Sequence, residues 1–349
     1  MNYDERYMHR AIQLARNGQI FASPNPMVGA VIVYNDTIIG EGFHRRCGEA
    51  HAEVNAVASV SHPELLPLAT IYVTLEPCSH YGKTPPCAQL IIDKKIPRVV
   101  IGCLDPFEKV SGRGVKMLQD AGIEVIWGVL ENECKELNSK FITCHTKQRP
   151  FITLKWAQSS DGFIDHHRTH QTPNAIKIST PITSCFVHKL RATHDAIMVG
   201  SSTVIKDNPS LNCRSWNGNN PKRIVIDRQT KLHNTANIFN DKLSPTIYFT
   251  SKIRKELPCD VEQILVDTNS SLCEIMRILY NKGITSVLLE GGASLLQNAI
   301  DNNIWDEAQV EISPITLCKK GSINAPILNI MPYKSLEIDN HYFAFYHNK

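Results

Sequence analysis

Residues 51–57, HAEVNAV, and residues 75–87, LEPCSHYGKTPPC, place one histidine, one glutamate and two cysteines in a specific order. Catalytic zinc sites use nitrogen and sulfur ligands, and the protein supplies three of them so that the fourth position stays open for water. His51, Cys78 and Cys87 offer one nitrogen and two sulfurs. The two prolines before Cys87 predict that a helix begins there, where the helix dipole favours a thiolate. These stretches therefore predict a metal centre.

The order His-x-Glu, then Pro-Cys and a second cysteine, is typical of zinc deaminases, which usually have two residues between the cysteines. Eight residues separate Cys78 from Cys87 here. Zinc lowers the pKa of its water toward neutrality, and the hydroxide attacks the amino-bearing ring carbon. Glu53 lies close enough to His51 to shuttle the proton to the departing ammonia without ligating the metal. Taken singly, these side chains would more often be core or surface residues, but their joint order favours the zinc site.

Length and composition indicate a globular chain of two domains, with 349 residues, 42% apolar and 20% charged. A net charge of +3 is too small to argue for nucleic acid or an anionic membrane as a partner. The eleven cysteines are odd in number and scattered, which excludes a secreted disulfide scaffold. The N-terminal stretch has no apolar signal core and no segment is long enough to span a bilayer, so we expect a cytoplasmic protein.

Helix and strand patterns alternate through residues 1–146, which we expect to form the first domain. Residues 28–43 predict a hairpin that turns at Asn35 and Asp36. Helices are predicted at 4–17, 50–60, 87–95, 114–122 and 130–146, and further strands at 70–76, 98–104 and 123–129. These elements predict a three-layer α/β domain, and the polar, proline-ended stretch KQRP at 147–150 marks its end.

Residues 147–349 predict a second α/β unit. In EGGASLL, paired glycines between a strand and a helix would let backbone N–H groups approach a phosphate, although a plain tight turn has the same pattern. The polar run VGSSTVIKDNPSLNCR borders a ligand or is an ordinary surface loop. Strands are predicted at 151–159, 195–204, 222–227, 246–250 and 284–292, and helices at 183–194, 271–283 and 293–303.

Three stretches carry a closer resemblance: SPNPMVGAVIV at 23–33, HAEVNAV, and EPCSHYGKTPPC with its long cysteine spacing. Together they resemble the bifunctional deaminase/reductases of riboflavin biosynthesis, over essentially the whole chain. The resemblance implies a cytidine-deaminase-like three-layer αβα domain followed by a dihydrofolate-reductase-like α/β domain. It also implies deamination of 2,5-diamino-6-ribosylamino-4(3H)-pyrimidinone 5′-phosphate with zinc, then reduction of the ribosyl group to ribityl by NADPH. We expect a homo-oligomer, a dimer or a tetramer, that acts on this small phosphorylated pyrimidine.

The resemblance also assigns site residues by position. In the first domain, Glu53 is the catalytic residue and His51, Cys78 and Cys87 bind zinc. The pyrimidine and its ribose phosphate would be held by Asn25, His44, His80 and Lys83, with Asp105 bordering the site. In the second domain, the substrate would be contacted by Arg191, Leu211, Arg214 and Glu290. The NADPH site would be lined by Ala157, Lys177, Thr203, Asp207, Arg228, Gly292, Ala293, Ser294, Leu295, Leu296, Gln297 and Asn298, with Arg228 reaching the 2′-phosphate.

The chain departs from the family pattern before the second-domain helix. The family commonly has Ser-x-Trp-Ile-Thr there, whereas this chain reads AIKIS, with Ala175 for the serine and Lys177 for the tryptophan. A deaminase whose second half is only structural or a dimerisation module is therefore the nearest alternative. A deaminase of nucleic acids would need a basic stripe with stacking aromatics, which the sequence lacks. The histidine-rich stretch 165–174 is predicted to be a solvated loop rather than a metal site.

Overall fold

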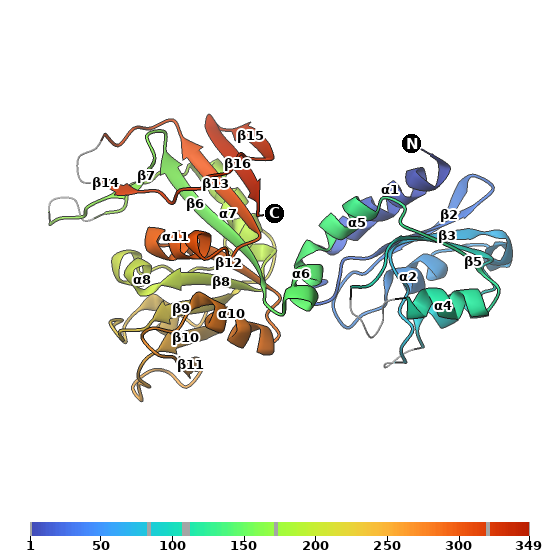
Figure 1. Ribbon diagram of the computed structural model, residues 1–349, viewed down its shortest axis with the longest axis horizontal. Helices are drawn as coiled ribbons and strands as arrows, with labels where there is room; N and C mark the ends of the chain where they lie inside the picture. Colours follow the sequence, from blue (N-terminus) through green and yellow to red (C-terminus); the bar gives the residue numbers. More distant parts are fainter. Residues whose placement is uncertain (1, 82–84, 107–111, 171–173, 319–321, 349) are drawn as a thin grey trace. The chain divides into compact units, whose positions relative to one another are not determined.

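The computed structural model describes residues 2–81, 85–106, 112–170, 174–318 and 322–348. The chain forms two compact units, Met1–Gln148 and Arg149–Lys349 (Figure 1). The division between them falls within the KQRP stretch. No helix in the described ranges is long and apolar enough to cross a membrane.

The first unit is built on a five-stranded sheet in the order β2-β1-β3-β4-β5. Its strands are β1 (Gly29–Tyr34), β2 (Thr37–Phe43), β3 (Thr70–Leu75), β4 (Arg98–Cys103) and β5 (Glu124–Trp127). β1 runs antiparallel to β2 and β3, while β3, β4 and β5 are parallel. The hairpin turn at Asn35 and Asp36 is confirmed. Both residues have positive φ, 50° and 60°, as in the two-residue turns that match the twist of antiparallel strands.

Helices cover both faces of this sheet. Alternate residues of β1 point to opposite sides: Val31 and Val33 pack with α1 (Tyr3–Ala15) and α5 (Glu131–Leu137), whereas Ala30 and Ile32 pack with the helices of the other face. Those helices are α2 (Ala52–Ala58), α3 (Cys87–Asp93) and α4 (Arg113–Asp120) (Figure 1). The predicted three-layer α/β fold is therefore confirmed. Two short 3₁₀ turns, Arg16–Gly18 and Pro63–Leu68, complete the connections.

A close backbone approach fixes α2 against β2. A Cβ atom at Gly42 would lie 2.3 Å from the backbone nitrogen of Ala56, a distance that no real side chain tolerates. Only glycine at this position lets α2 pack so tightly on the strand. This packing sets where α2 begins relative to the sheet, and therefore where His51, the residue just before α2, lies.

The single helix predicted at 130–146 is wrong, because the chain breaks at Asn138 into α5 and α6 (Ser139–Lys147). Asn138 is buried and leaves the helical conformation. Its side chain accepts a hydrogen bond from Met27 N at 2.8 Å and donates one to Met27 O at 2.9 Å. This tertiary pairing competes with helix continuation, and it anchors the segment that carries Asn25.

The second unit contains a nine-stranded sheet in the order β11-β10-β9-β8-β12-β6-β13-β16-β15, parallel from β11 to β13 and antiparallel beyond. A short separate sheet pairs β7 with β14. The strands are β6 (Phe151–Ser159), β7 (Phe163–His166), β8 (Ala196–Gly200), β9 (Lys222–Asp227), β10 (Thr246–Thr250), β11 (Val261–Leu265), β12 (Ser286–Gly291), β13 (Glu307–Ser313), β14 (Ser322–Asn324), β15 (Lys334–Ile338) and β16 (His341–His347).

Helices again cover both faces. α10 (Leu272–Asn281) and α11 (Ala293–Asp301) enclose the larger apolar cluster on one face, while α8 (Ser201–Asp207) and α9 (Asn237–Asn240) enclose a second cluster on the other. α7 (Pro181–Ala192) packs on β16 through Phe186 and Phe343, whose ring centroids lie 5.9 Å apart. The predicted α/β class of this unit is confirmed.

The strand predicted at 195–204 is wrong in its second half. The strand ends at Gly200, and residues 201–207 form α8. Val204 and Ile205 favour a strand by propensity, but Val204 is buried in the cluster formed with β8 and β9. Packing of one helix face against the sheet overrides that propensity. Strands β7, β11 and β13 to β16 were not among the predicted elements.

Replacing Asn138 by alanine should lower the free energy of unfolding of the first unit by about 1–3 kcal/mol, because the partly buried N–H and C=O of Met27 would both lose their partner. Chemical denaturation followed by circular dichroism measures this loss. The exposed Asn132, on α5, is the matched control, and Asn132→Ala should change stability little. Equal effects of the two substitutions would contradict an anchoring role for Asn138.

Candidate active sites

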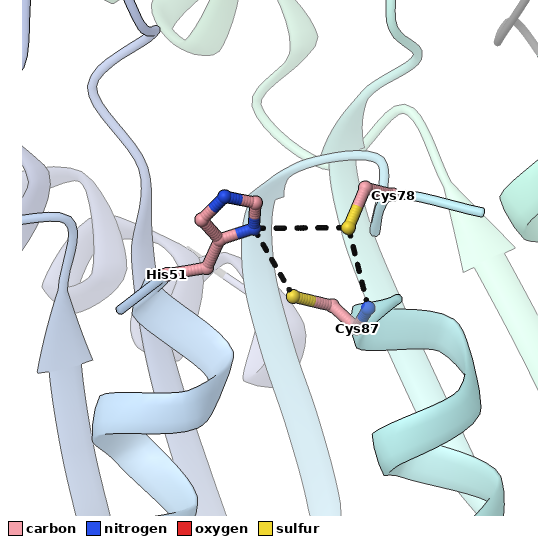
Figure 2. Close-up of side chains that lie close together, drawn as sticks. All are labelled: His51, Cys78 and Cys87. Atoms are coloured by element: carbon pink, nitrogen blue, oxygen red, sulfur yellow. Dashed lines mark hydrogen bonds between the residues drawn. The ribbon is translucent and has the colours of Figure 1, made fainter. Parts of the chain in front are cut away.

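The predicted metal ligands converge in the first unit from three different elements. His51 is the extended residue just before α2, Cys78 follows β3, and Cys87 is the first residue of α3, as the prolines predicted. Figure 2 shows His51 Nδ1 facing both sulfurs, 3.7 Å from Cys78 Sγ and 3.3 Å from Cys87 Sγ. All three donor atoms lie within 4.8 Å of one another. One nitrogen and two sulfurs around a common point form a donor set that fits zinc.

The electrostatics around the cluster also fit a metal site. Hydrogen bonds from the Cys87 side chain, from His51 and from the backbone N–H of Cys87, which lies 3.2 Å from Cys78 Sγ, hold the pKa of Cys78 below its usual value, while the contact with Cys78 and burial raise the pKa of Cys87. A thiolate is the form that binds metal. Glu53 lies on the first turn of α2 with only 3% of its surface exposed, and burial raises its pKa to about 7. A carboxyl group with such a pKa can both take up and release a proton near neutral pH.

Two of the four predicted substrate residues lie beside this cluster. The His44 ring is edge-on to the His51 ring, with centroids 5.5 Å apart. His44 Nδ1 lies 3.1 Å from Ala50 O and therefore donates, so His44 Nε2 accepts from Asn25 Nδ2 at 3.1 Å. Burial lowers the pKa of His44, which favours this neutral tautomer. A fixed neutral ring holds the Asn25 amide in one orientation.

Two of the other three predicted residues of this site, His80 and Asp105, lie in loops. His80 is exposed in the connection between β3 and α3, and Lys83 lies outside the described residues. Asp105 follows β4, and its backbone N–H donates to Glu76 Oε2 at 3.2 Å. The roles assigned to these three residues remain predictions.

Sequence reasoning missed Glu76, which directly precedes Pro77 and Cys78. It is buried, and its carboxylate accepts four backbone N–H bonds of 2.9–3.3 Å, from Asp105, Gly112, Gly114 and Val115. One side chain thus ties the end of β3 to the end of β4 and to the start of α4. A charged residue that ends an otherwise apolar strand was the signal available in the sequence.

The second unit contains a cavity of about 740 Å³ at the carboxyl ends of its parallel strands. Ligands of open α/β sheets bind at this edge. Nine of the twelve residues predicted for the cofactor line it. These are Ala157, Lys177, Thr203, Asp207, Gly292, Ala293, Ser294, Leu295 and Leu296. Ala175, which stands where the family pattern has serine, also lines the cavity, as Lys177 does.

The other three predicted cofactor residues do not appear in the lining. Gln297 donates to Asp301 and accepts from the backbone of Ile327. Asn298 lies further along α11. Arg228 follows β9, and its Nε atom is buried without a hydrogen-bond partner among the described residues. The assignment of Arg228 to the 2′-phosphate therefore remains a prediction.

Of the four predicted substrate residues in this unit, Glu290 lines the cavity. It forms a two-pronged ion pair with Arg191, through Nε at 2.9 Å and Nη2 at 2.6 Å. Burial opposes the charge of Glu290, but the Arg191 guanidinium outweighs burial and lowers the Glu290 pKa. Leu211 is buried in the apolar cluster beneath α8, and Arg214 is exposed and donates to Asn212.

Three further cations, Lys155, Arg168 and Lys206, line the cavity and were missed by sequence reasoning. Lys155 stands in the middle of β6, and burial lowers its pKa. A lysine within the apolar run FITLKW was a signal in the sequence, since a charge in a central strand needs a reason. Arg168 bridges two other lining residues, donating to Asp165 and pairing with Asp207 at 2.6 Å. It lies in the histidine-rich stretch that was predicted to be a solvated loop.

Comparison with known proteins agrees with both sites. Residues 1–103 match the family model of the cytidine and deoxycytidylate deaminase zinc-binding region, and residues 150–328 match that of the RibD C-terminal domain. The riboflavin biosynthesis protein RibD of Bacillus amyloliquefaciens is 40% identical over 333 residues, which cover 93% of this chain and 87% of the relative. RibD of Aquifex aeolicus is 39% identical over 315 residues, which cover 89% and 87%.

A solved structure gives the same result over the whole chain. The diaminohydroxyphosphoribosylaminopyrimidine deaminase/5-amino-6-(5-phosphoribosylamino)uracil reductase of Thermotoga maritima superimposes with a TM-score of 0.86 at 39% identity, covering 98% of this chain and 97% of that one. The predicted pairing of a cytidine-deaminase-like unit with a reductase unit is thereby confirmed. The chain belongs to the RibD family of riboflavin biosynthesis proteins.

Proposed function

We propose that the two units divide the two reactions of a bifunctional riboflavin-biosynthesis enzyme. The first unit deaminates 2,5-diamino-6-ribosylamino-4(3H)-pyrimidinone 5′-phosphate, and the second reduces the ribosyl group of the product to ribityl with NADPH. The observation that carries the proposal is the convergence of His51, Cys78 and Cys87 beside the buried Glu53. The experiment is to incubate the purified protein with the diamino substrate, with and without NADPH, and to identify the products by mass.

In the first unit, His51, Cys78 and Cys87 hold the zinc ion. Zinc supplies the Lewis acidity that activates water near neutral pH. Glu53 takes up a proton at its carboxylate and returns it to the departing ammonia, for which its raised pKa suits it. Asn25, held by His44, binds the pyrimidine edge, and His80 and Lys83 bind the phosphate. The balanced change is the replacement of the ring amino group by oxygen, with water consumed and ammonia released.

In the second unit, the cavity would hold NADPH and the ribosyl group of the substrate. NADPH supplies the hydride. The start of α11, at Gly292 and Ala293, lines the cavity, and the free backbone N–H groups of a helix start suit a phosphate of the cofactor. Glu290, kept charged by Arg191, accepts hydrogen bonds from the substrate. Buried charges of both signs orient the substrate without help from solvent.

The alternative of a second half without reductase chemistry is not favoured. The reductase family model matches residues 150–328, and the relatives match over most of the chain. Thr203, Asp207 and Glu290 line one cavity despite the changes at Ala175 and Lys177. Lys177 adds a positive charge to a cavity that receives a phosphorylated cofactor.

We also propose that the enzyme works in the cytoplasm as a homo-oligomer. Ile327, Ile330 and Met331, in the segment that precedes the edge strand β15 in the sequence, are exposed. Large exposed apolar side chains and an open strand edge each support contact with a second copy. Light scattering with size-exclusion chromatography measures the assembly, and a monomer at micromolar concentration would contradict this part of the proposal.

Glu53→Gln should retain zinc and lose deamination by about a hundred- to ten-thousand-fold, because an amide cannot shuttle a proton. Ammonia release under saturating substrate measures the rate, and metal analysis measures zinc. Cys78→Ala is the matched comparison, since it should lower the zinc content itself. Near-normal turnover of Glu53→Gln would exclude the role given to Glu53, and full zinc retention in Cys78→Ala would exclude this cysteine as a ligand.

Glu290→Gln should slow the NADPH-dependent reduction by about ten- to a hundred-fold, since it breaks a charge-assisted pair and leaves the Arg191 charge without its partner. Deamination by the same protein should continue at the wild-type rate. The exposed Glu337, on β15, provides the control Glu337→Gln, which should affect neither reaction. Loss of deamination in folded Glu290→Gln protein would contradict the division of the reactions.

A further inference from the structure

One side of the reductase cavity is formed by residues 175–179, the segment that leads into α7. Ser179 is the last of these residues, and its hydroxyl donates a hydrogen bond of 2.6 Å to Glu311 Oε2. Glu311 belongs to β13, on which it lies between Ala157 of β6 and Phe343 of β16. A residue of the cavity wall is thus joined to a carboxylate in the interior of the sheet.

Glu311 is fully buried, with 0% of its surface exposed, and both of its oxygens are used. Oε1 lies 2.8 Å from Nδ1 of His341, which is itself buried and donates to it. A buried carboxylate without partners would be strongly destabilising, so this three-residue arrangement holds Glu311 in a single orientation. None of the roles derived above uses it.

The hydrogen bonds among Ser179, Glu311 and His341 determine whether the Ser179 hydroxyl can donate to a ligand or only accept from it. A serine hydroxyl has one hydrogen and two lone pairs, and a carboxylate can only accept. Because the single hydrogen of Ser179 is committed to Glu311, only lone pairs remain for a ligand. With the reductase function proposed above as its basis, we propose that Glu311 is a positioning residue that makes Ser179 a hydrogen-bond acceptor for an N–H or O–H group of the bound cofactor or pyrimidine.

The same geometry excludes a nucleophilic role for Ser179. An activated serine donates to a histidine that an acid orients, whereas here the carboxylate stands between Ser179 and His341. The group that receives the Ser179 hydrogen bond is therefore a carboxylate and not the imidazole that activates a triad serine. The hydroxyl oxygen of Ser179 offers a ligand an acceptor, and the ammonium group of Lys155, which lines the same cavity, offers it a donor. The Lys155 charge also interacts with Glu290 and Glu311.

The test is a double-mutant cycle between Ser179→Ala and Glu311→Met, a change that removes the carboxylate and keeps a similar volume. We measure the Kd of NADPH and the Kd of the deaminated pyrimidine by equilibrium titration, and kcat/KM for the reduction. Each single variant should weaken the binding of at least one ligand by about three- to tenfold, the usual worth of one hydrogen bond. The double variant should be no weaker than Ser179→Ala, because Glu311 acts through Ser179.

Three controls separate this role from a structural one. Asp339→Asn makes a comparable change at the exposed carboxylate that accepts from Thr180, the neighbour of Ser179 outside the cavity lining, and should leave both Kd values unchanged. Ser179→Thr keeps the hydroxyl and should bind both ligands as the wild type does. Deamination by the first unit should be normal in every variant.

Unchanged Kd values in Ser179→Ala, or additive losses in the double variant, would overturn the proposal. If Glu311→Met does not fold, the comparison of Ser179→Ala with Ser179→Thr decides alone, since a merely structural hydroxyl would change the melting temperature but not ligand affinity. A wild-type protein that does not reduce the pyrimidine would instead count against the proposed function, and this is seen before any variant is compared.

Discussion

The first unit depends on the need to bring three metal donors from separate parts of the chain to one point. His51 and Cys87 stand at the starts of two helices on one face of the sheet, and Cys78 stands at the end of the strand beside them. Backbone packing fixes α2, and with it His51, as the close approach of Gly42 to Ala56 shows. Deamination therefore relies on the accuracy with which the sheet sets these helix starts.

The two sites differ in how far local sequence encodes them. The three metal ligands of the deaminase site and the hairpin turn at Asn35 and Asp36 could be predicted, because the His-x-Glu, Pro-Cys and turn motifs each span only a few residues. The hairpin, the start of α3 and the clustering of the ligands follow from such local rules. Glu76 escaped prediction because its four N–H partners come from a segment about 30 to 40 residues further along the chain.

The reductase cavity could be predicted only through resemblance, because its wall joins segments that are distant in sequence. Periodicity misassigned residues 201–204 to a strand, since the packing of Val204 against the sheet favours a helix there. Likewise, the break at Asn138 depends on a pairing with Met27, more than a hundred residues away. A pattern of residues along the chain reveals neither the sheet that packs on Val204 nor the pairing of Asn138 with Met27. The proposed roles of Lys155, Arg168 and Glu311 depend on contacts that form only when the chain folds.

The four N–H bonds of Glu76 have a consequence for how this family can vary. Two of them come from Asp105 and Gly112, so one carboxylate accepts hydrogen bonds from both ends of the connection between those residues. The entropy of closing a loop rises only slowly with its length once its ends are fixed. Residues could therefore be inserted into or deleted from this connection during evolution with little disturbance of the zinc motif that begins at the next two residues after Glu76. The Glu76 carboxylate thus holds Asp105 and Gly112 in place whatever the number of residues between them.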